Sequence, residues 1–315
     1  MGTKSLTLLT IIAMVTAVVA QQLPPAPPDS LTGVIDFHCH TGPDAMGRSI
    51  NDFELVRLAH RAGMRGIVLK NHFMPTADRA QLAMEETKGI EVFGGVVLNR
   101  AVGGLNAEAI QEMLKVDGQR GKIVWLPTFD AENQVKFSKE HRPFVSVVKD
   151  GKPVPELAEI FDLIAKNDLI LETGHSSAEE SLILIDAAKK AGVKKIVVTH
   201  AMADPCCAKD EQLKQMADMG AIMELVFLNT LQGPNAAVAS ERSHAQISIS
   251  DCARVIKAIG AEHFLISSDL GQQYNPVHPD GMLAFINGLK AEGLDDHAID
   301  LVARKNPARL LGLDQ

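Results

Sequence analysis

Apolar and polar positions recur in a regular order along the chain from Gly33 onward. Short apolar, β-branched runs each end in polar residues, and most are followed by a stretch in which apolar residues recur at helical spacing. These runs predict eight β-strands: Gly33–His40, Arg65–His72, Ile90–Asn99, Gly121–Asp130, Asp168–Ser176, Lys194–Ala201, Gly220–Asn229 and His263–Gly271. Strands that alternate with helices in this way are typical of an α/β protein with parallel strands.

The helices between these strands are predicted from their periodicity and from signals at their ends. Ser177, with Glu180 three residues later, predicts a capping box at the start of one helix. Asn306, followed by Pro307, predicts the start of a last helix. The remaining helical stretches are Asn51–Ala62, Thr76–Lys88, Asn106–Lys115, Pro155–Lys166, Asp210–Met219, Met282–Leu289 and His297–Arg304.

Two connections are longer than the others, and both are predicted to cover one end of the fold. The connection between the fourth and fifth strands contains Asp150–Gly151 between β-branched runs, which indicates a hairpin. The connection 230–248, between the seventh and eighth strands, is polar and contains a Gly-Pro-Asn turn. Long loops in a compact domain are typical of lids over an active site, and surface decoration is the alternative.

Composition and charge exclude some classes of partner. The 315 residues carry a net charge of −8 and form no basic stripe, so we expect no nucleic-acid partner. With one tryptophan and one tyrosine, the chain has few large aromatic side chains on which bases could stack. The expected partner is a small-molecule substrate, and the sequence leaves a homo-oligomer open.

The N-terminus has the features of an export signal in their usual order. Lys4 precedes the apolar run Leu6–Val19, and Ala20 ends a small-residue cleavage pattern before Gln21. The run is short for a membrane span, which needs roughly 20 residues, and an uncleaved anchor is the alternative. We therefore predict a signal peptide (1–20), an extended linker (21–32) and one folded domain (33–315). The mature protein is expected to be periplasmic or secreted, with no stable membrane span once the signal is removed.

Export makes the four cysteines relevant, because an oxidising compartment permits disulfides. Cys206 and Cys207 are adjacent, so they form either a strained vicinal disulfide or two free thiols. Cys39 lies between two histidines in the first strand and is predicted to face the helix layer, and Cys252 starts a helix. Because no CxxC spacing is present, a cysteine-built zinc site is not expected.

Residues that bind metals end several of the predicted strands. Side chains alternate along a strand, so His38 and His40 share one face about 6.6 Å apart, where two imidazoles can converge on one divalent ion. His175 and His200 end the fifth and sixth strands, and Asp269 ends the eighth after an apolar run. A carboxylate buried there must be paired or bound to a metal. These five residues predict a divalent metal site.

The metal site also decides between the two folds that eight alternating strands allow. In an open sheet the first and eighth strands would lie tens of ångströms apart, since neighbouring strands are separated by roughly 4.8 Å. In a closed barrel the carboxyl ends of all strands face one mouth. We therefore predict a single (β/α)8 TIM barrel with the metal site at the C-terminal mouth of the strands.

This order of ligands resembles that of the amidohydrolase superfamily of metal-dependent barrels, in which HxH follows the first strand, His the fifth and sixth, and Asp the eighth. The segment Asn306–Leu313 is also similar to the terminal helix of many members. The resemblance extends from Gly33 to Leu313 and implies a metal-dependent hydrolase, without specifying the substrate.

The resemblance also implies roles for the five residues. His38, His40 and His175 would be metal ligands, and Asp269 would be both a ligand and the proton acceptor. His200 would bind a second metal or orient the attacking water. The imidazole-rich ligand set favours one or two Zn²⁺ ions, with Mn²⁺ or Fe²⁺ as alternatives.

The fourth strand departs from the family pattern. Many members with two metals place a carboxylated lysine or a glutamate at the end of this strand to bridge them, whereas Val124–Asp130 has no such residue at the expected place, and Asp130 lies late, in the loop. The site therefore either holds one metal or takes its bridge from elsewhere.

Lys70 on the second strand is a candidate for the missing group. It shares a face with His72, which we predict to contact substrate. Lys70 would act either as a carbamate bridging two metals or as a cation holding a substrate oxyanion, and a salt bridge to a carboxylate is the alternative. The strand is also similar to that of the polymerase-and-histidinol-phosphatase family, but Asn71–His72 replaces the Asp-His pair of that family.

For other charged residues the sequence gives weaker evidence of a role in the site. Arg48 and Arg100 follow strand ends and are predicted to hold an anionic substrate, as is Arg79, with solvated surface charge as the alternative for each. Glu172 and Glu224 lie within strands, where salt bridges facing the helices are expected.

The predicted activity is hydrolysis of an amide, lactam, lactone or ester of a small molecule by metal-activated water. A metal-dependent decarboxylase of a small carboxylic acid, a phosphoesterase-like barrel, and a non-catalytic barrel that binds a metal or ligand are the alternatives. Fold resemblance alone does not decide among them.

Overall fold

A computed structural model of the chain describes residues 23–313. The predicted signal peptide and the first residues of the linker lie outside this range. The described part of the linker packs on the barrel: Leu31 is buried, and the Ala26 amide donates a 2.7 Å hydrogen bond to Asp280 Oδ1. Within residues 23–313, every helix is too short or too polar to cross a membrane.

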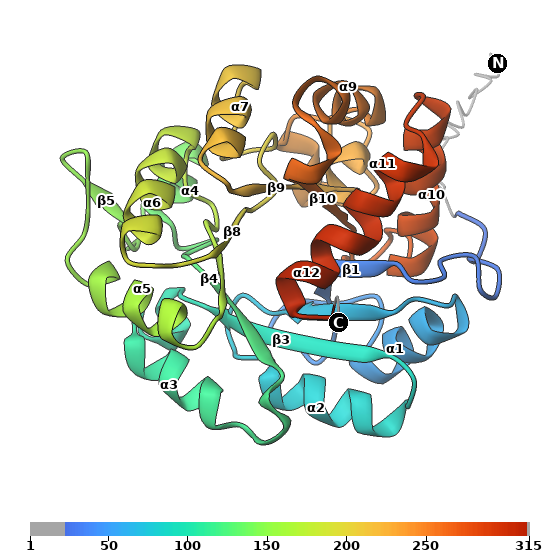
Figure 1. Cartoon of the computed structure of the whole chain (residues 1–315), viewed down its shortest axis with the longest axis horizontal. Coiled ribbons are helices and arrows are strands. Elements are labelled where there is room, and N and C mark those ends of the chain that lie inside the picture. Colours follow the sequence, from blue (N-terminus) through green and yellow to red (C-terminus); the bar gives the residue numbers. More distant parts are fainter. Residues whose placement is uncertain (1–22, 314–315) are drawn as a thin grey trace, which may run out of the picture.

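Eight parallel strands form one sheet in the order β1-β2-β3-β4-β7-β8-β9-β10 (Figure 1). Their bounds are Ile35–His40 (β1), Gly66–Lys70 (β2), Glu91–Val97 (β3), Gly121–Trp125 (β4), Ile170–Glu172 (β7), Lys195–Val198 (β8), Ile222–Val226 (β9) and Phe264–Ser267 (β10). All eight predicted strands are present, and most are shorter than predicted at their carboxyl ends.

The sheet closes where the segment after β10 meets β1. The His40 amide donates to the Leu270 carbonyl at 2.9 Å, and the Asp269 amide donates to the His38 carbonyl at 2.9 Å. The predicted (β/α)8 barrel is therefore confirmed, and two of the candidate metal ligands, His38 and Asp269, are joined through the backbone across this seam.

Twelve α-helices accompany the strands within the described range. Their bounds are Asp52–Arg61 (α1), Ala77–Glu86 (α2), Ala107–Lys115 (α3), Glu132–Phe137 (α4), Leu157–Lys166 (α5), Ala178–Lys190 (α6), Asp210–Asp218 (α7), Leu228–Leu231 (α8), Ile249–Ile259 (α9), His278–Ala291 (α10), Asp296–Asp300 (α11) and Asn306–Leu311 (α12). The capping box predicted at Ser177 and Glu180 is present.

The last helix, α12, starts at Asn306 with proline in its first turn, as predicted, but Asn306 does not act as its cap. A π-helical turn, Leu301–Lys305, runs directly into α12, so the Asn306 backbone is already helical. Its side-chain amide instead donates hydrogen bonds to the carbonyls of Ala261 and Phe264, at 2.9 and 2.7 Å. Asn306 therefore joins the last helix to the start of β10.

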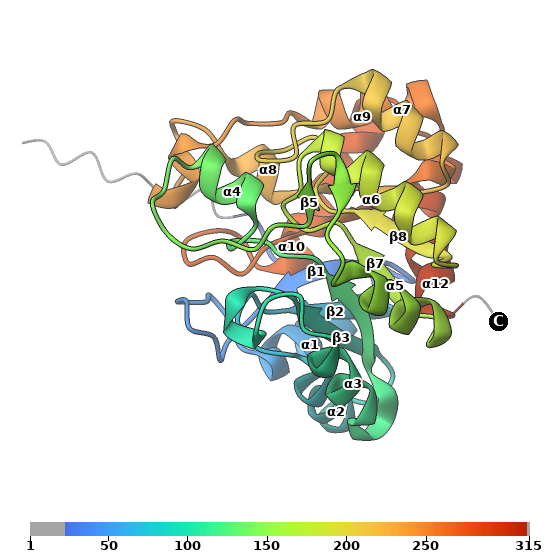
Figure 2. The same cartoon turned by 90° about the vertical axis from the view of Figure 1, so that its left-hand side faces the viewer.

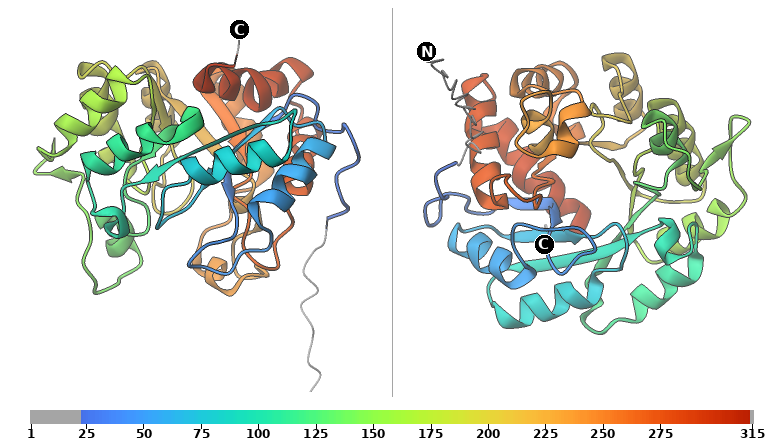
Figure 3. Two further views of the ribbon diagram at one scale, coloured as in Figure 1. Left: turned by 90° about the horizontal axis from the view of Figure 1, so that it is seen from below. Right: turned by 180° about the vertical axis from the view of Figure 1, so that it is seen from behind.

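The barrel interior is filled by apolar side chains that come from every strand. They are Ile35, Phe37, Val68, Phe93, Val97, Ile123, Trp125, Ile170, Val197, Ile222 and Leu265, together with Ala308, Leu310 and Leu311 of α12. Helix α12 lies at the end of the barrel opposite α4 and α8 (Figures 2 and 3). The last helix thus closes the amino-terminal end of the barrel and leaves the carboxyl-terminal end for the site.

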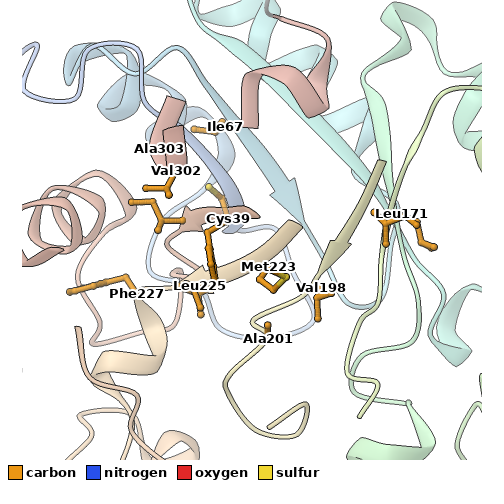
Figure 4. Close-up of a cluster of buried hydrophobic side chains, with 14 of the residues drawn as sticks. Cys39, Ile67, Leu171, Val198, Ala201, Met223, Leu225, Phe227, Val302 and Ala303 are labelled. Atoms are coloured by element: carbon orange, nitrogen blue, oxygen red, sulfur yellow. The ribbon is translucent and has the colours of Figure 1, made fainter. Parts of the chain in front are cut away.

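A second apolar layer packs between the strands and the surrounding helices (Figure 4). Cys39 belongs to this layer, as predicted. The register of β1 against β2 shifts between Asp36 and Cys39. All four cysteines are free in the structure, with Cys206 buried and Cys207 exposed.

The hairpin predicted at Asp150–Gly151 is also present. It joins Val148–Lys149 (β5) to Lys152–Pro153 (β6), which pair antiparallel. Both turn residues have positive φ, 51° and 73°, as expected for the type I′ turn that this pair of residues favours.

Candidate metal centre

A cavity of about 490 Å³ opens at the carboxyl ends of the strands. All five predicted metal-site residues line it: His38, His40, His175, His200 and Asp269. The connection 230–248 supplies part of its outer wall through Gln232 and residues 237–241 and 244, so the predicted position of this lid is confirmed. The connection between β4 and β7 also reaches the cavity, through Gln134 of α4, whereas its β5–β6 hairpin is not among the lining residues.

Three of the five residues converge closely enough to share one ion. His38 Nε2 and His40 Nε2 lie 3.0 and 3.1 Å from the same oxygen, Oδ1 of Asp269. All three residues are buried, and each offers a ligand atom within 4.8 Å of the others. The backbone pairing of β1 with the segment after β10 creates this arrangement.

The Nδ1 atom of each of the two imidazoles contacts a group other than Asp269. His38 Nδ1 lies 3.2 and 3.3 Å from the two carboxylate oxygens of Glu224, and His40 Nδ1 lies 3.2 Å from the Lys70 carbonyl. Because the Glu224 carboxylate only accepts, His38 Nδ1 is the donor in that contact. His40 Nδ1 faces both an acceptor, the Lys70 carbonyl, and a donor, Arg48 Nη2 at 3.3 Å. His38 Nε2 is buried and faces Asp269 Oδ1 at 3.0 Å. This donor set of two imidazole nitrogens and a carboxylate oxygen fits a divalent transition metal.

His175 and His200 complete the wall beside these ligands. Their ring centroids are 4.9 Å apart, and the His200 ring lies 6.4 Å from that of His38. His175 Nδ1 contacts Gln134 Oε1 at 2.6 Å, which directs its other nitrogen away from α4. His200 Nδ1 is buried and unpartnered in the described part of the chain. Both line the cavity but neither belongs to the close group of three, and their roles in binding a metal or orienting water stay predictions.

Burial controls the protonation of these imidazoles. It lowers the pKa of His40 and of His175 well below their ordinary value, and it lowers the pKa of His200 to about 4. The three rings are therefore neutral at neutral pH, which is the state that binds a metal.

Lys70 points into the barrel, because it is two residues beyond the interior residue Val68 on the same strand. Its Nζ is buried, has no hydrogen-bond partner among the described residues and lies 5.2 Å from the centroid of the Trp125 ring. Burial lowers the pKa of Lys70, while Glu172, Asp269 and Glu224 act in the opposite direction. No ion pair of Lys70 is found in residues 23–313, so the salt-bridge alternative is not supported.

The prediction that Glu172 and Glu224 face the helices is wrong. Each lies two residues after an interior residue, Ile170 or Ile222, so strand alternation turns it into the barrel. Glu172 accepts from Thr199 Oγ1 at 2.9 Å. Burial, followed by repulsion from Glu224, raises the pKa of Glu172 well above its ordinary value.

The predicted substrate-binding residues separate into two groups. His72 lines the cavity, stacks on Phe129 with ring centroids 3.9 Å apart, and contacts Thr128 Oγ1 at 2.8 Å through Nδ1. Arg48 also lines the cavity, where its Nη2 is 3.3 Å from His40 Nδ1 and its Nε donates to Asp44 at 2.6 Å.

The structure does not bring Arg100 or Arg79 into the cavity. Arg100 is exposed and lies in a separate depression with Phe144 and Glu156, because the chain after β3 turns outward there. Arg79 Nε lies 2.7 Å from Asp52 Oδ2, and this ion pair joins α2 to α1.

Two functional-site residues were not predicted from the sequence. Gln134 belongs to α4, a short helix with weak sequence signals. Glu224 could have been placed inside the barrel by the alternation of Ile222, Met223 and Glu224, had the inward face of that strand been known.

Comparisons with known proteins agree with this fold. A family model described as "Family of unknown function (DUF6282)" matches residues 33–224. No curated protein matches the chain. The barrel resembles an organophosphorus hydrolase from Deinococcus radiodurans, with 13% identity, a TM-score of 0.57, and coverage of 92% of this chain and 97% of that one.

Two further solved structures have the same fold. An amidohydrolase from Pseudomonas aeruginosa is 12% identical with a TM-score of 0.59, and the match covers 90% of this chain and 96% of that one. A protein from Pseudomonas putida assigned as a 2-pyrone-4,6-dicarboxylic acid hydrolase is 18% identical with a TM-score of 0.57, covering 90% and 99%. The predicted resemblance to metal-dependent amidohydrolase barrels is confirmed at the level of the fold.

Proposed function

The chain belongs to the DUF6282 family, a family of unknown function, and from the geometry of its barrel mouth we propose that it is a metal-dependent hydrolase of a small molecule. The observation that carries this proposal is the convergence of His38 Nε2 and His40 Nε2 on the Asp269 carboxylate. The names of the structural neighbours, an organophosphorus hydrolase and an amidohydrolase among them, support hydrolysis as the reaction class.

His38, His40 and Asp269 would hold one divalent ion, which we propose to be zinc, with Mn²⁺ or Fe²⁺ as alternatives. When bound, such an ion polarises a scissile carbonyl and makes water acidic enough to lose a proton near neutral pH. His175 and His200 would extend this ligand set or orient the water.

Asp269 is placed to accept the proton that the attacking water loses. Its side chain retains a 10% exposed fraction at the cavity surface, so it is reachable from the substrate side while it contacts both histidines. The same carboxyl would return the proton to the leaving group.

Lys70 is proposed to stabilise negative charge on the substrate. A buried ammonium without an acceptor is costly, and an oxyanion that develops in the cavity would supply one. Trp125 presents its ring face to the lysine, which favours a cation over a carbamate at this position. We therefore favour the oxyanion role over the bridging carbamate.

The substrate bond is proposed to be an amide, lactam, lactone or ester. The cavity wall combines carboxamides (Gln134, Asn229, Gln232, Gln272, Gln273) with the apolar Phe129, Leu228 and Val238. This mixture suits a small molecule with a polar reacting end and an apolar remainder.

A panel of esters, lactones, lactams and amides, assayed before and after metal removal, tests the proposed function. We expect turnover of at least one class that a chelator abolishes and that added Zn²⁺, Mn²⁺ or Fe²⁺ restores. Turnover that survives complete metal removal would contradict it.

Decarboxylation remains the second candidate, because an unpaired lysine beside the candidate ligands also suits a substrate carboxylate. Release of carbon dioxide from a small carboxylic acid without hydrolysis of any panel member would favour the decarboxylase.

A further inference from the structure

A wholly buried carboxylate, Glu224, links the strands that carry the candidate ligands. It lies on β9, between β8 and β10 in the barrel. Strand β9 supplies none of the five predicted ligands, yet its glutamate contacts residues of three other strands or their ends.

Three groups donate to this carboxylate. His38 Nδ1 on β1 lies 3.2 Å from Oε1, the Ser267 hydroxyl on β10 lies 2.6 Å from the same oxygen, and the backbone amide of His200, just after β8, lies 3.1 Å from Oε2. Ser267 precedes Asp269 by two residues. Each of the three donors therefore belongs to, or directly precedes, a segment with a candidate ligand.

These three donors restrict which side chain, in which protonation state, fits at position 224. A backbone amide donates only, and an ionised carboxylate is the side chain that accepts at both of its oxygens. An amide in its place would present one donor to these groups. A glutamine therefore leaves a single acceptor oxygen for His38 Nδ1 and the His200 amide, and the hydrogen bond to His38 is weakened.

We propose that Glu224 is a positioning residue for the metal centre: it keeps Nδ1 of His38 protonated and hydrogen-bonded, so that Nε2 is the nitrogen that faces the metal position, and it fixes the chain at His200. This inference rests on the proposed function in its reference to a metal. The proton on Nδ1 can be observed in the metal-free protein, where Asp269 Oδ1 is a second acceptor, 3.0 Å from Nε2.

The barrel contains a matched control for this role. Glu172 on β7 is also wholly buried and also points into the interior, but it accepts from the Thr199 hydroxyl rather than from a candidate ligand. Glu172→Gln and Glu224→Gln therefore make the same chemical change, and only the second removes an acceptor from a candidate ligand.

The first test is ¹⁵N NMR of histidine-labelled, metal-free protein, in which the two ring nitrogens report the tautomer. We expect a protonated Nδ1 of His38 in the wild type and in Glu172→Gln, and a smaller fraction protonated at Nδ1 in Glu224→Gln. An unprotonated His38 Nδ1 in the wild type would overturn the proposal without any variant, even if Glu224→Gln failed to fold.

The second test is the dissociation constant of Zn²⁺, measured by competition with a chromophoric chelator. Loss of a residue that orients a metal-binding histidine weakens binding by about 10- to 100-fold. We expect a loss of this size for Glu224→Gln and less than roughly a threefold change for Glu172→Gln. Equal losses in the two variants would overturn the positioning role. A wild type that binds no metal would instead contradict the proposed function, while the tautomer would still decide the role of Glu224.

Discussion

His38 and Asp269 contribute to the candidate metal centre from two segments that pair across the barrel seam. We predict that His38→Ala or Asp269→Asn abolishes metal binding and turnover while the fold is kept, because the barrel interior is made of other, apolar side chains. Metal analysis and circular dichroism of both variants check this. Arg100→Ala, outside the cavity, is the control and should behave as the wild type. Full activity in His38→Ala or Asp269→Asn would mean that the site is elsewhere.

Lys70 offers a second prediction at the level of the residue. Lys70→Met keeps the length and apolar stem of the side chain and removes the buried charge. If Lys70 stabilises an oxyanion, turnover should fall by about 10²- to 10³-fold while zinc stoichiometry stays unchanged. Thermal stability should not fall, since an unpaired buried ammonium is costly. Unchanged turnover with a loss of stability would show that Lys70 is structural.

The residues of the site were predictable to different degrees, for physical reasons. Histidines and an aspartate at strand ends are visible in the sequence, because the end of an apolar run marks them. Arg100 resembles Arg48 in this respect, yet only Arg48 reaches the cavity, because loop direction after a strand is not encoded in the strand pattern. Glu224 was missed because its role depends on contacts with residues far apart in the sequence.

At the scale of elements, the seam between β1 and the end of β10 is the most sensitive position. Gly271 has φ of 124°, and a Cβ there would lie 1.9 Å from the His40 carbonyl oxygen. We predict that Gly271→Ala displaces the end of β1, lowers the melting temperature and weakens zinc binding. Gly151→Ala, in the β5–β6 turn, is the matched control: its φ is 73° but its Cβ would meet open space, so only a cost of about 1 kcal/mol from the left-handed backbone is expected. Equal effects on zinc binding would refute this account of the seam.

Element prediction succeeded where local signals were strong. All eight strands, the Ser177 capping box and the Asp150–Gly151 hairpin were predicted, since apolar periodicity and turn residues act over a few residues. The start of α12 was predicted, but the capping role of Asn306 was not found, because a π-helical turn runs directly into this helix. The connection between β4 and β7 reaches the cavity through Gln134 and not through its hairpin, because where a hairpin packs depends on tertiary contacts.

At the scale of the whole molecule, buried histidines make the metal-free barrel sensitive to acid. Burial lowers the pKa of His200 and of His278 from 6.5 to about 4. The unfolded chain therefore binds more protons than the folded one between these values. Their contribution to stability is complete above pH 6.5 and is lost as pH falls towards 4, by up to about 1.4 kcal/mol per pH unit for each group.

Two buried carboxyls oppose this loss of stability in acid, because the pKa of Asp36 is raised to about 6 and that of Glu172 is also raised. Three further histidines add to the loss, because their pKa values are lowered: His40, His72 and His175. We predict that denaturant unfolding of metal-free protein shows decreasing stability from pH 6.5 to 4, with a shallower slope in His278→Gln. An increase in stability over this range would contradict the prediction.

The central claim is that the barrel mouth holds a divalent metal between His38, His40 and Asp269. Anomalous diffraction at the zinc absorption edge, from crystals of zinc-loaded protein, tests it most directly. We predict an anomalous peak in bonding contact with His38 Nε2, His40 Nε2 and the Asp269 carboxylate. Zinc-loaded crystals with no peak in the cavity, or with a peak that none of these three residues contacts, would contradict the account.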